Sequence, residues 1–144
     1  MDSARHILHL DDNPADLELV RLAVAEGGHR DIVVDGVSSP QAALARIAAG
    51  PTPELIICDL RLPDSDGMQF IQRLRQLPAL ARVSVILLTG VQSAEAPRDQ
   101  PFVAGIYHKP PVWAELVVLM TDLVRRFLPP REVVVIPGRT RTDH

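Results

Sequence analysis

Short apolar runs alternate with amphipathic stretches along most of the chain. The apolar runs have the length and the β-branched content of buried strands, and they lie at His6–Leu10, Ile32–Val37, Leu55–Cys58, Val83–Leu88 and Gly105–His108. The stretches between them place apolar residues at helical spacing, which predicts helices at Pro14–Ala25, Ser39–Ala49, Asp66–Leu77 and Val112–Leu128. Because such strands connect by right-handed crossovers, the pattern predicts an α/β protein with a doubly wound, five-stranded parallel sheet.

Two segments depart from this alternation. Between Gly90 and Gly105, Pro97 and Pro101 oppose a long helix, so we expect a short or irregular one. Residues 129–144 lie outside the pattern, which divides the chain into a domain at 1–128 and a C-terminal extension. The extension is either a disordered tail, as its Pro, Arg and Thr content indicates, or an arm whose Val133–Ile136 segment pairs with another chain.

Composition narrows the class of protein. The chain has 144 residues, of which 47% are hydrophobic and 23% charged, and this is typical of one globular domain. A formal charge of −3 argues against nucleic acid as the main partner, because phosphate binding needs a basic face. The sequence has neither an apolar run long enough for a membrane span nor a signal-peptide pattern, so we expect a cytoplasmic protein. A single cysteine, Cys58, cannot form an internal disulfide.

Polar residues follow four of the five predicted strands. Asp11 and Asp12 come after the first strand, Asp59 after the third, Thr89 after the fourth and Lys109 after the fifth. In a doubly wound sheet the functional crevice lies beyond the carboxyl ends of the strands, so these side chains are expected to converge. Lys109 is the only lysine beside fourteen arginines, which favours a chemical role for a compact point charge at this position.

The converging side chains predict phosphoryl chemistry. Carboxylates packed closely repel one another unless a hard cation lies between them, and Mg²⁺ prefers such oxygen ligands. A carboxylate beside Mg²⁺ can attack a phosphoryl donor, while Lys109 and the Thr89 hydroxyl bind the remaining phosphoryl oxygens. The histidines show no spacing typical of a zinc site (His6, His9, His29, His108 and His144).

These residues resemble the receiver domains of two-component response regulators over roughly residues 5–128. The resemblance rests on the acidic pair Asp11-Asp12, on Asp59 within residues 56–67, on Thr89-Gly90 and on Lys109-Pro110. It implies a flavodoxin-like (βα)5 fold and a signalling domain rather than an enzyme, with at most slow self-phosphorylation and autodephosphorylation. The implied partners are a sensor histidine kinase and either a downstream protein target or a phosphotransfer protein.

The resemblance also assigns roles to individual residues. It makes Asp59 the phosphoacceptor and Lys109 the phosphoryl-binding cation, with Thr89 as the switch hydroxyl. It implies Mg²⁺ binding by Asp59, by Asp11 and Asp12, and by the main-chain carbonyl of Arg61. The Lys109–Pro110 bond is expected to be cis, as is common in this family.

A narrower resemblance concerns the run from Asp12 to Asp16. It is similar to the opening of stand-alone receivers that accompany phytochrome-type kinases. Such receivers can dimerise through C-terminal extensions, so the resemblance implies a phytochrome-type kinase partner and a homodimer.

One position departs from the family pattern. The switch aromatic of receivers usually lies three residues before the lysine, where this chain has Ile106, and Tyr107 follows one place later. Because side chains alternate along a strand, this shift points the tyrosine ring to the other face of the sheet. Either a β-bulge restores the usual direction of the ring, or the switch residue is aliphatic.

Two other functions stay open at this stage. One is a receiver fold used only for binding, without phosphorylation. The other is a haloacid-dehalogenase-like phosphatase, which also uses an Asp nucleophile and Mg²⁺. That family carries a second Asp two residues after the nucleophile, where this chain has Arg61, so the phosphatase is the weaker alternative.

Overall fold

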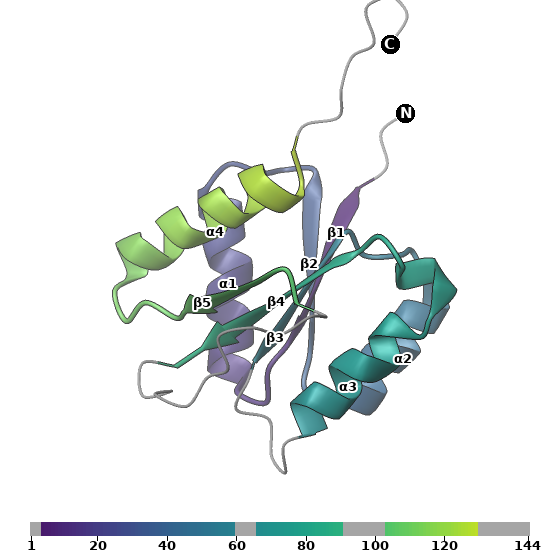
Figure 1. Ribbon diagram of the computed structural model, residues 1–144. Helices are drawn as coiled ribbons and strands as arrows, with labels where there is room; N and C mark the ends of the chain where they lie inside the picture. Colours follow the sequence, from purple (N-terminus) through teal and green to yellow (C-terminus); the bar gives the residue numbers. More distant parts are fainter. Residues whose placement is uncertain (1–3, 60–65, 91–102, 130–144) are drawn as a thin grey trace, which may run out of the picture.

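The computed structural model describes residues 4–59, 66–90 and 103–129. Its elements are β1 (Arg5–Leu10), α1 (Pro14–Glu26), β2 (Ile32–Val37), α2 (Pro40–Ala49), β3 (Leu55–Asp59), α3 (Asp66–Arg75), a 3-10 turn (Pro78–Leu80), β4 (Ser84–Thr89), β5 (Gly105–His108) and α4 (Trp113–Phe127). The five strands form one parallel sheet in the order β2-β1-β3-β4-β5 (Figure 1). The prediction of a doubly wound, flavodoxin-like sheet is therefore confirmed.

Helices cover both faces of the sheet. Helices α1 and α4 pack on one face, and α2 and α3 lie on the other (Figure 1). Along the central strand β3, Leu55 and Ile57 belong to the first cluster, whereas Ile56 and Cys58 belong to the second. All five residues of β3 are buried, as expected for a parallel strand covered on both sides. The burial of the strand therefore fixes the position of its last residue, Asp59, at the carboxyl end of the sheet.

Capping residues set where the helices begin. The Asn13 side chain accepts a hydrogen bond from the Ala15 N–H at 2.9 Å, and Pro14 occupies the first position of α1. The Ser39 hydroxyl accepts a hydrogen bond from the Ala42 N–H at 3.1 Å and starts α2 in the same way. Helix α1 starts only four residues after the last residue of β1, so its first turn lies close to the carboxyl end of that strand.

Several expectations lie outside the described residues. They are the irregular helix between Gly90 and Gly105, most of which falls in residues 91–102, the arm at Val133–Ile136 and the carbonyl of Arg61. In the described part of the chain the cis peptide bond is Gly50–Pro51, so the expectation of a cis Lys109–Pro110 bond is not met. No helix in these same described ranges is long and apolar enough to cross a bilayer.

Arg5 joins the beginning of the sheet to the end of the last helix. Its guanidinium donates hydrogen bonds to Asp31 at 2.8 Å and to the main-chain oxygens of Leu128 at 2.8 Å and Pro129 at 2.7 Å. Arg5 is 6% exposed, so these donors are largely shielded from water. A planar guanidinium serves three acceptors at once, which an ammonium group cannot do in the same geometry.

The Arg5 contacts predict a large stability effect for a residue far from the acidic side chains. Replacing Arg5 by Met is expected to lower the free energy of unfolding by about 2–3 kcal/mol, because buried charge-assisted hydrogen bonds are lost. The free energy of unfolding of Arg5→Lys should lie between those of Arg5→Met and the wild type. Urea unfolding measures both variants.

The matched control is Arg21→Met, because Arg21 pairs with Glu18 on the exposed surface of α1. Exposed pairs of this kind contribute about 0–1 kcal/mol. Equal losses in the Arg5 and Arg21 variants would contradict the assigned role of Arg5.

Candidate functional site

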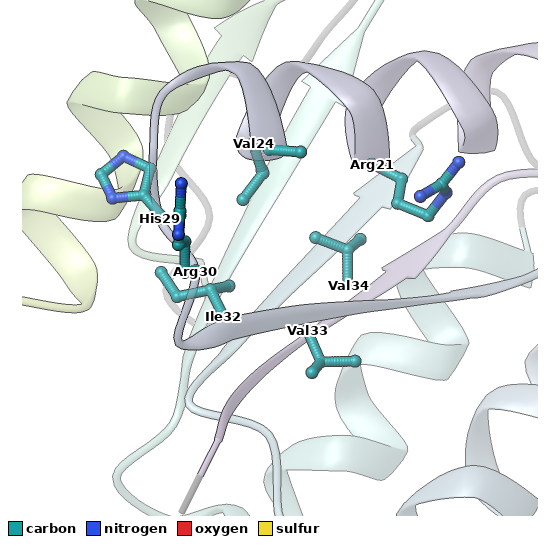
Figure 2. A pocket seen from close by; sticks show the side chains of 8 residues that line it. Arg21, Val24, His29, Arg30, Ile32, Val33 and Val34 are labelled. Carbon is teal, nitrogen blue, oxygen red and sulfur yellow. The ribbon is translucent and has the colours of Figure 1, made fainter. Parts of the chain in front are cut away.

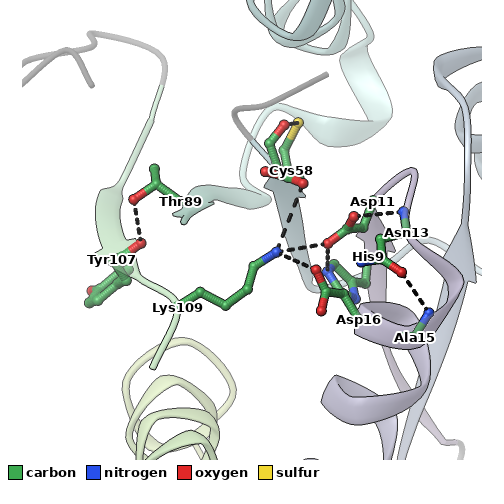
Figure 3. Close-up of polar contacts among 10 residues, drawn as sticks. His9, Asp11, Asn13, Ala15, Asp16, Cys58, Thr89, Tyr107 and Lys109 are labelled. Atoms are coloured by element: carbon green, nitrogen blue, oxygen red, sulfur yellow. Dashed lines mark hydrogen bonds and ion pairs between the residues drawn. The ribbon is translucent and has the colours of Figure 1, made fainter. Parts of the chain in front are cut away.

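The carboxyl ends of the strands bring the sequence-predicted side chains together. Asp11 follows β1, and its N–H donates to the Val37 carbonyl at 3.0 Å. Asp59 and Thr89 are the last residues of β3 and β4. Lys109 follows β5, with its N–H bonded to the Thr89 carbonyl at 2.6 Å. The backbone pairing of neighbouring strands therefore extends to residues of the site. Figure 3 shows the Lys109 side chain pointing from the end of β5 toward Asp11.

Three carboxylates form the acidic part of the site. Asp11, Asp12 and Asp59 each offer an oxygen, and these oxygens all lie within 4.8 Å of one another. Asp11 and Asp59 are fully buried, whereas Asp12 is exposed. A set made only of carboxylate oxygens and open to solvent on one side suits a hard divalent cation that keeps part of its hydration shell. The donor atoms present thus fit Mg²⁺, although their role as ligands stays a prediction.

Lys109 provides the positive charge of the site. Its ammonium nitrogen lies 3.1 Å from Asp11 Oδ2, 2.8 Å from Asp16 Oδ2 and 3.9 Å from Asp59 Oδ2. Burial alone would lower the pKa of Lys109, but the hydrogen bond to Asp16 and the charges of Asp59 and Asp11 outweigh it and raise the pKa. Lys109 therefore stays charged at neutral pH.

Lys109 also affects the buried carboxyl group of Asp11. Burial raises the pKa of Asp11, but the hydrogen bond from the Asn13 N–H and the ammonium of Lys109 lower it more, so the pKa lies below its usual value. Asp11 is thus held as a carboxylate, which is the form that binds a cation.

The Thr89 hydroxyl points toward β5. It donates to the Tyr107 carbonyl at 3.4 Å (Figure 3). It also lies 3.3 Å from the ring nitrogen Nδ1 of His108. Thr89 itself is fully buried. The contact with His108 was not predicted from the sequence, because it depends on the pairing of Thr89 with His108 between β4 and β5.

A family model adds to this geometry. The response regulator receiver domain matches residues 7–108, which is more than half of the chain. The chain belongs to the response regulator receiver family. Receiver domains are signalling domains of two-component systems, and the resemblance stated from the strand-end residues is thereby confirmed.

Curated relatives of this receiver extend beyond the region that they share with it. The transcriptional regulatory protein AruR of Pseudomonas aeruginosa is 33% identical over 85 residues, which cover 58% of this chain and 34% of AruR. The response regulator Rcp1 of Synechocystis sp. is 33% identical over 88 residues, covering 58% of this chain and 60% of Rcp1. The similarity thus spans less than two thirds of each of these relatives.

Solved structures share the receiver fold over nearly the whole length of both chains. The Mn²⁺-bound form of Rcp1 has 26% sequence identity and a TM-score of 0.67, covering 93% of this chain and 99% of that one. The phosphorylated cyanobacterial phytochrome response regulator RcpA has 23% identity and a TM-score of 0.72, covering 90% of this chain and 98% of that one. The structural neighbours of this receiver therefore include a protein described as a phytochrome response regulator.

The two candidate switch residues face opposite sides of the receiver sheet. Strands β4 and β5 pair residue for residue from Ile86↔Gly105 to Thr89↔His108, without a bulge in these described pairs. Ile106 packs against the cluster on the α2/α3 face, and Tyr107 packs against the cluster on the α1/α4 face. Of the two alternatives left by the sequence, the structure thus removes the β-bulge.

Tyr107 is held on its face by two neighbours. A Cβ added at Gly105 would lie 2.8 Å from a ring carbon of Tyr107, so the ring occupies the space that a side chain at this position would fill. The Tyr107 hydroxyl accepts a hydrogen bond from Arg126 of α4 at 3.0 Å. The Arg126 contact ties the tyrosine to the last helix rather than to the acidic side chains.

Two functional neighbours were missed from the sequence. Asp16 was noted only as part of a family-like run, yet its carboxylate binds Lys109. Its position in the first turn of a helix that starts just after Asp12 was the available signal. His9 was considered only for zinc spacing, yet it is fully buried on β1 beneath the acidic cluster. Its place inside a buried strand, two residues before Asp11, was the signal in that case.

His9 is neutral in the folded protein. Burial lowers its pKa from 6.5 to about 4, although the charge of Asp11, whose Oδ2 lies 3.8 Å away, acts in the opposite direction. Neither ring nitrogen has a hydrogen-bond partner among the described residues. Charging His9 would thus place a second cation beside Lys109 in a buried location.

The lowered pKa of His9 predicts a loss of stability in acid. Between pH 6.5 and about 4 the unfolded chain binds a proton at this residue and the folded protein does not, so stability falls as the pH falls. His9→Leu should reduce the loss of unfolding free energy between about pH 7 and pH 4.5 by about 2 kcal/mol. Urea unfolding at several pH values measures the slope, and His108→Gln controls for removal of an exposed histidine.

Cys58 lies beside the site without a chemical role there. It is fully buried, and burial together with the charges of Asp59 and Asp11 raises the pKa of its thiol to about 12. The thiol is therefore not a nucleophile at neutral pH. Cys58 instead packs with the apolar residues of the α2/α3 face.

A separate hollow lies between α1 and the outer strand β2. It has a volume of about 490 Å³. Figure 2 shows that Val24, Ile32 and Val34 line it together with the polar residues Arg21, His29 and Arg30. The lining residues include no carboxylate and none of the strand-end residues. This hollow is therefore distinct from the acidic site.

Proposed function

We propose that this receiver accepts a phosphoryl group on Asp59 from a histidine of a sensor kinase. The observation that carries the proposal is the convergence of buried Asp59 with Asp11, Asp12 and the ammonium of Lys109. A bound Mg²⁺, held by these three carboxylates and by the main-chain carbonyl of Arg61, would offset negative charge on the transferring group. The proposal includes the division of the chain into a receiver at 1–128 and an extension at 129–144.

The chain's own residues divide the work of transfer. A carboxylate oxygen of Asp59 attacks phosphorus, so an O–P bond forms while the N–P bond of the phosphohistidine breaks and its electron pair returns to the donor nitrogen. Lys109 lies within 3.9 Å of the Asp59 carboxylate and would bind one phosphoryl oxygen. Burial of Asp59 limits water near the acyl phosphate, which favours slow rather than rapid hydrolysis.

Two further side chains are proposed to pass the signal on. Thr89 would turn its hydroxyl from β5 toward the phosphoryl group, giving up its contacts with the Tyr107 carbonyl and His108. Ile106 occupies the family's switch position and faces the side of the sheet where the switch aromatic is expected, so we assign it the switch role. Tyr107, held by Arg126 on the other face, is not needed for that step.

Incubation with Mg²⁺ and acetyl phosphate tests the phosphoacceptor. The intact protein should gain one phosphoryl group that is stable in acid and labile in base, as expected for an acyl phosphate. Asp59→Asn should abolish the gain, and Asp122→Asn, an exposed aspartate of α4, should leave it unchanged. Intact-protein mass spectrometry reads the result. No gain in the wild type would leave the fold as a phosphorylation-independent interaction module.

The proposed partners are a sensor kinase of the phytochrome type and either a downstream protein target or a phosphotransfer protein. The name of one structural neighbour supports the first of these, since RcpA is described as a cyanobacterial phytochrome response regulator. The net charge of −3 favours a protein partner over nucleic acid.

We also propose a homodimer formed through the extension at residues 129–144. Its Val133–Ile136 segment has the β-branched composition of a strand, and an unpaired segment of this kind favours pairing with a second copy. Removing residues 130–144 should convert a dimer to a monomer in analytical ultracentrifugation. The truncation keeps Leu128 and Pro129, whose carbonyls bind Arg5, so the domain itself should stay folded. The same oligomeric state with and without the extension would refute its role as a dimerisation arm.

A further inference from the structure

Lys109 makes its shortest contact with a residue outside the proposed phosphorylation site. Its ammonium lies 2.8 Å from Asp16 Oδ2 but 3.9 Å from Asp59 Oδ2, which is beyond hydrogen-bond distance. Asp16 comes from the first turn of α1 and not from a strand end. Figure 3 shows the Lys109 side chain reaching past the end of β3 toward Asp11 and Asp16.

The Asp16 contact is shielded enough to matter. The side chain of Lys109 is 14% exposed and that of Asp16 is 18% exposed, so few water molecules compete for either group. Hydrogen bonds between ionised partners in such surroundings are roughly twice as strong as those between neutral groups. The contact with Asp16 is thus a substantial part of what places the ammonium in the absence of a phosphoryl group.

An ammonium has three N–H donors, and two of them are already engaged. They bind Asp11 at 3.1 Å and Asp16 at 2.8 Å. The nearest oxygen of Asp59 lies 3.9 Å from the ammonium, so binding a phosphoryl oxygen there would draw Lys109 toward β3. Such a movement would lengthen the contact with Asp16. Asp16 and the phosphoryl group therefore compete for the same cation.

We propose that Asp16 is a positioning residue that holds Lys109 on the α1 side of the pocket and so lowers the affinity of Lys109 for a phosphoryl group on Asp59. The inference rests on the proposed function. Asp16 acts through Lys109 and belongs neither to the phosphoacceptor nor to the three carboxylates grouped as a cation site. Its carboxylate sets how strongly the phosphorylated form is favoured over the resting one.

A purely structural role makes a different prediction. A carboxylate in the first turn of a helix interacts favourably with the helix dipole, so loss of Asp16 lowers stability whatever Lys109 does. Loss of that interaction would not change the affinity for a phosphoryl analogue. Glu18 provides the matched control, because it lies in the same helix and pairs with exposed Arg21 rather than with Lys109.

Calorimetric titration with beryllofluoride in the presence of Mg²⁺ tests the competition in the full chain. D16N should bind the analogue about three- to tenfold more tightly than wild type, the range expected when one partly shielded charged hydrogen bond is removed. D16S is a second neutral variant in case D16N folds poorly. D16E, which keeps the carboxylate, should stay close to wild type, and E18Q should match wild type.

A double-mutant cycle shows whether Asp16 acts through Lys109. K109A should weaken binding, and adding D16N to K109A should give no further tightening. A second readout needs neither metal nor analogue. Because Lys109 is the only lysine, its ammonium gives one ¹⁵N resonance, which should shift in D16N and not in E18Q.

The outcomes separate this inference from the proposed function. If the wild type binds beryllofluoride and D16N and D16S bind no more tightly, the role of Asp16 is refuted and the phosphoacceptor stands. Tightening that persists in the K109A background also refutes it, because the effect would then come from charge alone. A wild type that binds no beryllofluoride overturns the proposed function and this inference with it.

Discussion

One ammonium group allows two carboxylates to stay buried at the end of the sheet. Asp11 and Asp59 are fully buried, and isolated carboxylates in such a position would be strongly disfavoured. Lys109 comes from the edge strand β5, whereas Asp11 follows β1, with β3 and β4 between them. The contact between these two residues therefore spans most of the sheet, and the arrangement of the strand ends depends on it.

The same charge is central to how the proposed phosphoryl group on Asp59 would be sensed. If each carboxylate of the site were paired with a cation of its own, the binding of another anion would change few contacts. Here Lys109 is shared among Asp11, Asp16 and, at longer distance, Asp59, so a new anion redistributes existing contacts. On the neighbouring strand, Thr89 bonds to β5 in a similarly exchangeable way. Both groups connect the pocket to β5, whose two faces carry Ile106 and Tyr107 toward different helices.

Most of the fold could be predicted from the sequence because each parallel strand is a short apolar run bounded by turn residues. Strands Ile32–Val37 and Gly105–His108 have the predicted limits, and α3 ends at Arg75, two residues before the predicted Leu77. Strand-end residues converge in any such sheet, so the neighbours of Asp59 from the other strand ends were predictable as well. The contact of Lys109 with Asp16 of α1 was not predicted, because it depends on how far the lysine side chain extends toward the first turn of that helix. The burial of His9, by contrast, was signalled by its place inside a buried strand.

The Arg5 contacts have a geometric consequence for anything joined to this receiver. They bind the carbonyls of Leu128 and Pro129 beside the beginning of β1, whereas Asp11 lies just past its other end. A six-residue strand spans about 20 Å, so Pro129 lies on the side of the domain remote from the proposed phosphoacceptor Asp59. A protein fused after Pro129 would therefore join the domain at the end opposite to the acidic site, and the proposed kinase would not have to compete with it for that site.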